Sequence, residues 1–174
     1  MPLVSLSQIT SPLVLQAHDY WQGKRRDGLL PSRANIDPAE IPRLLPNVLL
    51  SEISLSPFEV RYRLMGTEAA AMNNLDLTGK TLHFGIPTTR WQHYWAKAYL
   101  QSATEKEPVF GIDSYEYRDR GYLRFEWCLL PLASDGRSVD RFFEIEAYPQ
   151  NAQAREGLQS NCQATAAGVE KTLL

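Results

Sequence analysis

The spacing of apolar residues along the chain switches between helical and strand periodicity, and these switches predict the order of the elements. Near the N-terminus, Ser11 and Pro12 are typical of a helix start, and Ala17 and Trp21 follow on one helical face. We therefore expect a helix of about three turns. It should end near Gly23.

Two short stretches downstream predict a β-hairpin. Residues 48–53 form a brief apolar run, and residues 60–64 alternate apolar and basic side chains after a turn at Ser56 and Pro57. A short helix should follow at residues 68–72.

The strongest helical pattern begins at Pro87. Its aromatic stripe lies on one side of the helix, whereas His93 lies about 200° away from that stripe. We expect the stripe to face the core. The stripe comprises Trp91, Tyr94, Trp95, Ala98, Tyr99 and Ser102.

Residues 109–117, 122–132 and 139–148 have the alternation of three strands. One face of the second strand carries large apolar residues and should pack against the long helix. These residues are Leu123, Phe125, Trp127 and Leu129.

The turn between the last two strands decides their register. A two-residue loop at Asp135 and Gly136 would place Trp127 opposite Glu144, whereas a loop one residue longer would place it opposite Ile145. We expect the longer loop, because it pairs apolar residues with apolar residues.

The order of elements predicts an α+β domain with a five-stranded antiparallel sheet. Its crossover helices should lie on one face, since only one side of each strand is expected to be apolar. We divide the chain into an N-terminal helical extension (1–46), a core (47–148) and a flexible C-terminal tail (149–174), which is rich in Asn, Gln and Ala.

Several spaced motifs accompany this order between Tyr20 and Tyr148. They are Tyr20-Trp21, Gly28-Leu29-Leu30-Pro31-Ser32-Arg33, Ile36-Asp37-Pro38, Leu45-Pro46, Arg61-Tyr62-Arg63, Gly66-Thr67, Leu77-Thr78-Gly79-Lys80, Leu130-Pro131-Leu132 and Asp135-Gly136. With them the chain resembles the PAS superfamily, and more closely a small single-domain bacterial PAS-like family. The resemblance implies strand order 2-1-5-4-3, a sensory or interaction role and a homodimer through the N-terminal helix. It implies no agreed ligand and no catalytic residues.

Composition narrows the function classes. The 174 residues, 44% hydrophobic, suit one domain, and a net charge of −2 gives no general attraction to nucleic acid. No apolar run is long enough to span a membrane, and the N-terminus lacks a signal-peptide pattern. Cys128 and Cys162 are too few for a disulfide framework. We expect a cytoplasmic protein with no nucleic-acid or membrane partner.

A small-molecule site is expected between the sheet and the crossover helices. Its few polar groups, among them Tyr62, Ser114 and the indole nitrogens of Trp95 and Trp127, suit a compact aromatic or weakly polar ligand. An ordinary packed core is the open alternative. The predicted wall is Tyr62, Leu64, Met72, Leu82, Phe84, Trp95, Ile112, Ser114, Phe125, Trp127, Phe143 and Ile145.

The other sheet face should carry charged side chains, either solvated or at a partner interface. These are Arg61, Arg63, Arg124, Glu126, Glu144 and Glu146.

The sequence identifies no cofactor. Haem-binding PAS domains use a histidine of the long crossover helix, but His93 should point away from the pocket, and His83 is a weak candidate. Flavin photosensors of this fold use a crossover cysteine, and residues 66–87 contain none. Cys128 should lie on the outer sheet face, so redox sensing would need a second molecule.

We interpret the chain as a non-catalytic PAS-type sensory or signalling module that binds a small molecule and forms a homodimer through its N-terminal helix or outer sheet face. The first alternative is a ligand-free interaction or dimerisation module. The second is an enzyme like the cone-shaped α+β isomerases, with Asp113 and Tyr115 as acid and base. Phe110 and Ile112 place the core on the opposite face of that strand and argue against it.

Overall fold

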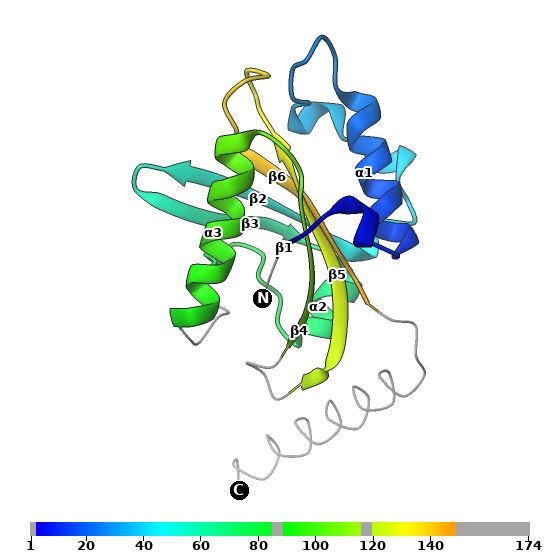
Figure 1. Cartoon of the computed structure of the whole chain (residues 1–174), viewed down its shortest axis with the longest axis vertical. Helices are drawn as coiled ribbons and strands as arrows, with labels where there is room; N and C mark the ends of the chain where they lie inside the picture. The colour runs from blue at the N-terminus through cyan, green and yellow to red at the C-terminus, as the bar shows by residue number, and fades with distance from the viewer. Residues whose placement is uncertain (1–2, 85–88, 116–119, 149–174) are drawn as a thin grey trace, which may run out of the picture.

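The computed structural model describes residues 3–84, 89–115 and 120–148 (Figure 1). For residues 115 and 120–123 it describes the backbone only. The predicted tail, Cys162, the helix start at Pro87 and the side chains of Tyr115 and Leu123 therefore lie outside the described residues. The main elements are β1 (Leu3–Val4), α1 (Pro12–Lys24), β2 (Val48–Leu55), β3 (Phe58–Met65), α2 (Thr67–Asn73), α3 (Thr89–Glu105), β4 (Val109–Tyr115), β5 (Arg120–Leu132) and β6 (Arg141–Ala147).

The strands form one antiparallel sheet in the order β1-β4-β5-β6-β2-β3. The α+β class and the order 2-1-5-4-3 of the five predicted strands are confirmed. The predicted strand number is wrong, because Leu3 and Val4 pair with β4 and add a sixth strand. A strand of two residues is too short to show an alternating pattern.

Helices cover both faces of the sheet (Figure 1). On one face, which we call the inner face, Trp95 of α3 packs on Trp127 of β5, with ring centroids 4.7 Å apart. On the other, the outer face, the rings of Tyr20 of α1 and Phe143 of β6 lie 6.3 Å apart. The crossover helices share the inner face as predicted, but the expectation that only this face is apolar is wrong.

The register between β5 and β6 differs from both predicted alternatives. Trp127 lies opposite Glu146, and Leu129 lies opposite Glu144. The one-residue difference turns β6 over, so that Glu144 and Glu146 point to the inner face.

A longer loop between Leu132 and Arg141 causes this register. The Asp135 carboxylate accepts hydrogen bonds from the backbone N–H groups of Arg137 and Ser138, at 2.8 and 2.6 Å. The loop also docks on the N-terminal region, where the N–H of Leu30 donates to the Gly136 carbonyl at 2.9 Å. Apolar pairing could not reveal the register, because α1 makes the outer face apolar as well.

A second irregularity lies between β2 and β3. Leu50 pairs with Leu64 and Ser51 pairs with Tyr62, so Arg63 is an extra residue in β3. As a result, Tyr62 is buried on the inner face, whereas Leu64 lies on the outer face and is 43% exposed.

Candidate functional site

The structure divides the predicted ligand-site residues into three groups. Buried in the core are Tyr62, Met72, Leu82, Trp95, Phe125 and Trp127. Exposed are Leu64 and Phe84. On the outer face are Ile112, Ser114, Phe143 and Ile145. The last group and Leu64 are wrong predictions. The register of β6 and the extra residue in β3 turn Phe143, Ile145 and Leu64 away from α3. On β4, Asp113 takes the inward position expected for Ile112 and Ser114.

Aromatic rings fill the inner face around Trp127. Tyr94 and Trp95 of α3 contact it, with ring centroids at 6.4 and 4.7 Å. On the neighbouring strand Gly111 leaves room for this indole, since a Cβ at that position would lie 2.3 Å from the ring. The inward orientation predicted for Trp127 is confirmed.

Asp113 is buried beside this cluster and is 3% exposed. Its Oδ2 accepts hydrogen bonds from the hydroxyl of Tyr94 at 2.6 Å and from Nε1 of Trp127 at 2.7 Å. Burial, together with the hydrogen bond to Asp113, raises the pKa of Tyr94 well above its ordinary value.

The predicted orientation of Asp113, away from the core, is therefore wrong. Phe110 and Ile112 do point to the opposite face, but that face is also covered. There, the ring of Phe110 packs edge-on against His18 of α1, at 5.7 Å between centroids.

Glu144 is a second buried carboxyl group and is 4% exposed. It accepts hydrogen bonds from Oγ of Ser51 and, at 2.8 Å, from the hydroxyl of Tyr99. The hydroxyl of Tyr62 lies 3.4 Å from that of Tyr99. Burial raises the pKa of Glu144 to about 8, although its hydrogen bonds oppose the shift.

The third acidic group of the inner face lies near α2. Glu146 Oε2 accepts a hydrogen bond from the side-chain amide of Asn73 at 2.9 Å, and the hydroxyl of Tyr148 also donates to it. The prediction that Glu144 and Glu146 lie on the charged outer face is thus wrong. Their spacing of two residues indicated that both side chains lie on one face of β6, but only the register with β5 decides which face that is.

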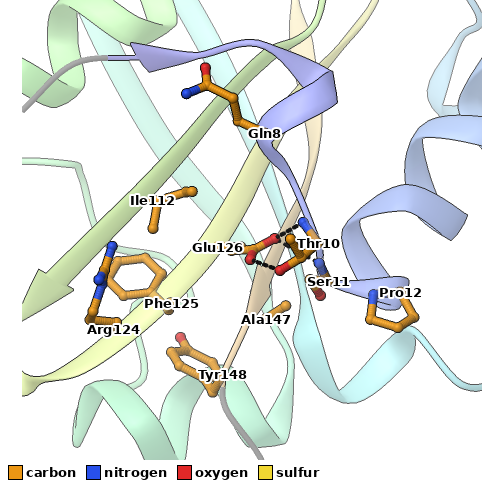
Figure 2. A pocket seen from close by; sticks show the side chains of 10 residues that line it. All are labelled: Gln8, Thr10, Ser11, Pro12, Ile112, Arg124, Phe125, Glu126, Ala147 and Tyr148. Carbon is orange, nitrogen blue, oxygen red and sulfur yellow. Dashed lines mark hydrogen bonds between the residues drawn. The ribbon is translucent and has the colours of Figure 1, made fainter.

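A cavity of about 490 Å³ lies on the outer face, beside the N-terminus of α1 (Figure 2). Glu126 of β5 stands in its wall and binds the chain just before the helix. Its carboxylate accepts hydrogen bonds from Thr10 N at 2.8 Å, Thr10 Oγ1 at 2.6 Å and Ser11 N at 2.7 Å. The lining residues are Gln8, Thr10, Ser11, Pro12, Ile112, Arg124, Phe125, Glu126, Ala147 and Tyr148.

A family model described as PAS domain matches residues 9–145, which is most of the chain. The chain belongs to the PAS domain family. No curated protein matches the sequence.

The other candidate groups of this PAS domain do not form a metal-binding cluster within the described residues. No cluster of three or more His, Cys, Asp or Glu side chains able to hold a metal ion occurs there. His93 and His83 are both exposed, and His93 points away from the aromatic stripe as predicted. Cys128 lies on the outer face as predicted and is fully buried, and burial raises the pKa of its thiol.

No helix in the described part of the PAS domain is long and apolar enough to cross a membrane.

Proposed function

We propose that this PAS domain is a non-catalytic sensory or signalling module that binds a small molecule between the inner sheet face and helices α2 and α3. PAS domains are typically sensory or signalling modules. The observation that carries the proposal is the pair of carboxyl groups buried on the inner face, Asp113 and Glu144, each bonded to a tyrosine of α3.

Two buried carboxyl groups contribute little to the stability of a purely structural core. Removing such a group from water costs free energy, which its hydrogen bonds only offset. On the inner face, these groups offer acceptors to a ligand that carries N–H or O–H donors. A compact aromatic ligand of this kind would pack on the rings of Trp95 and Trp127.

The tyrosines suggest how binding becomes a signal. A ligand donor that replaces the hydroxyl of Tyr94 or Tyr99 at its carboxylate would release one polar contact between α3 and the sheet. The helix and the sheet would then shift their packing, which is the type of change that a downstream partner can recognise.

The test is native mass spectrometry of freshly purified protein, followed by extraction of any bound compound. We expect a defined added mass on the wild-type chain. Asp113→Asn and Glu144→Gln should lose it, and Glu107→Gln, which changes an exposed carboxylate, should retain it. A wild-type chain without added mass, or variants that all retain it, would contradict the proposal.

A second candidate is a ligand-free interaction or dimerisation module. The close fit of Trp127 over Gly111 favours it, because the rings already fill that part of the inner face. Within the N-terminal helix, Trp21 would not serve in a dimer contact, since it is buried and its Nε1 donates to the Pro131 carbonyl at 2.8 Å. Sedimentation analysis showing a dimer with no added mass would favour this candidate.

A further inference from the structure

The cavity on the outer face has an apolar surface and two charged side chains, Glu126 and Arg124, and only Glu126 has hydrogen-bond partners among the described residues. Its lining surface is mostly apolar, with Ile112 and Ala147 on its floor and the ring of Phe125 at one end (Figure 2). Phe125 and Tyr148 connect this cavity to the inner layer, but the carboxyl groups of the proposed ligand site, Asp113 and Glu144, do not line it.

The negative group in the wall is already engaged. Both oxygens of Glu126 accept hydrogen bonds from Thr10 and Ser11, so its charge is shared with three donors at the start of α1. The carboxylate therefore acts as a clamp between β5 and α1, and it has little remaining capacity for a cationic ligand.

The positive group is not engaged. Arg124 lines the same cavity and is exposed, and it makes no ion pair or side-chain hydrogen bond within the described residues. A guanidinium at the edge of an apolar cavity suits one terminal carboxylate, which it can bind with two parallel hydrogen bonds.

We propose that this cavity binds a monoanionic amphiphile, that is, a carboxylic acid with an aliphatic or aromatic body. The carboxylate would pair with Arg124, and the apolar body would cover Ile112 and Ala147. A volume of about 490 Å³ lies within the usual size of small-molecule sites. Burial of the ligand's apolar surface supplies the main driving force.

The position of the site gives it a route to α1. The cavity wall includes Thr10, Ser11 and Glu126, whose hydrogen bonds hold the start of α1 on the sheet. A ligand in the cavity would therefore shield the hydrogen bonds between Glu126 and the start of α1 from solvent.

Isothermal titration calorimetry of the full chain tests the charge preference with two probes of equal chain length, decanoate and decylammonium. We expect saturable decanoate binding at one site per chain and weaker decylammonium binding. Arg124→Gln should weaken decanoate binding at least about tenfold, because it removes the charge-assisted hydrogen bonds to the carboxylate. Arg137→Gln, at an exposed position in the β5–β6 loop, is the matched control and should bind as the wild type does.

A second measurement locates the site. Decanoate should shift the methyl NMR signals of Ile112, and Ala147→Leu, which narrows the cavity, should reduce binding. Asp113→Asn should leave decanoate binding unchanged, so this test is independent of the inner-face proposal. The inference is overturned if decanoate does not saturate, if decylammonium binds equally well, or if Arg124→Gln binds like the wild type.

Discussion

The two faces of the sheet are both buried, but they are held to their helices by different means. The inner face is tied to α3 by polar contacts within the core, from Tyr94 to Asp113 and from Tyr99 to Glu144. The outer face contacts α1 through ring packing and a hydrogen bond from Nε1 of Trp21 to the Pro131 carbonyl, and its carboxylate clamp at Glu126 lies at the end of the helix. A polar contact inside a core requires one geometry, whereas apolar packing tolerates adjustment. The inner layer, with two buried carboxyl groups bonded to α3, therefore places more such constraints on its helix.

The largest expected effect tests the inner aromatic cluster. Trp127→Ala should lower the free energy of unfolding by about 3–5 kcal/mol, because it opens a cavity and removes a donor to Asp113. Urea denaturation measures the loss. Leu64→Ala, at a position that is 43% exposed on the outer face, should cost less than about 1 kcal/mol. A Trp127→Ala loss below about 1 kcal/mol would show that the indole is not core.

The next effect is a pH dependence of stability that comes from Glu144 on the inner face. Burial raises the pKa of Glu144 to about 8 from 4.5, so between these values the folded protein keeps a proton that the unfolded chain releases. The free energy of unfolding should therefore fall by about 2–4 kcal/mol as pH rises from about 5 to about 8. Urea denaturation at a series of pH values measures this fall.

Glu144→Gln removes the titrating group and should flatten that profile. Ser51→Ala keeps the carboxyl group and removes a hydrogen bond that lowers its pKa, so the fall should persist and extend to higher pH. An unchanged profile in Glu144→Gln would mean that another group controls it.

A smaller effect concerns the clamp on the outer face. Glu126→Ala removes three hydrogen bonds at the start of α1 and should cost about 1–2 kcal/mol, the usual effect of losing a helix cap. Hydrogen exchange should accelerate in α1 and remain slow in α3. Equal acceleration in both helices would show that the layers open together.

The smallest expected effect is an absence of reaction. In a Cys162→Ser background, Cys128 should not react with an aromatic disulfide reagent in the folded protein, since it is 1% exposed and its thiol pKa is raised. The same protein in urea should react at once. Rapid labelling without urea would show that the outer layer opens readily.

Helix positions were predictable because they depend on local periodicity, whereas the strand order was an expectation from the resemblance to the PAS superfamily. The spacing of Trp91 and Trp95 identified α3, and Ser11 with Pro12 identified the start of α1. These patterns need no knowledge of distant parts of the chain.

The contents of the candidate sites were less predictable, because they depend on contacts between distant residues. The rule that apolar residues face apolar residues failed for β6, where α1 makes a second apolar layer and leaves Glu144 inside. Likewise, Ser11 predicted a helix start but not its partner Glu126, which lies 115 residues away. Asp113 was assigned to the wrong face because Gly111, two residues earlier on that face, shows no apolar side chain. Its function of making room for the Trp127 indole depends on a contact with another strand.

The placement of the four tryptophans makes the two layers optically distinguishable. Trp21 alone reports on the outer layer, and its indole is fixed by the Pro131 carbonyl. Trp95 and Trp127 are close enough, at 4.7 Å, for their excited states to couple and give a paired signal in near-ultraviolet circular dichroism. A Trp21→Phe protein would thus report on the inner layer alone, so a ligand's effect on either layer could be followed without an attached dye.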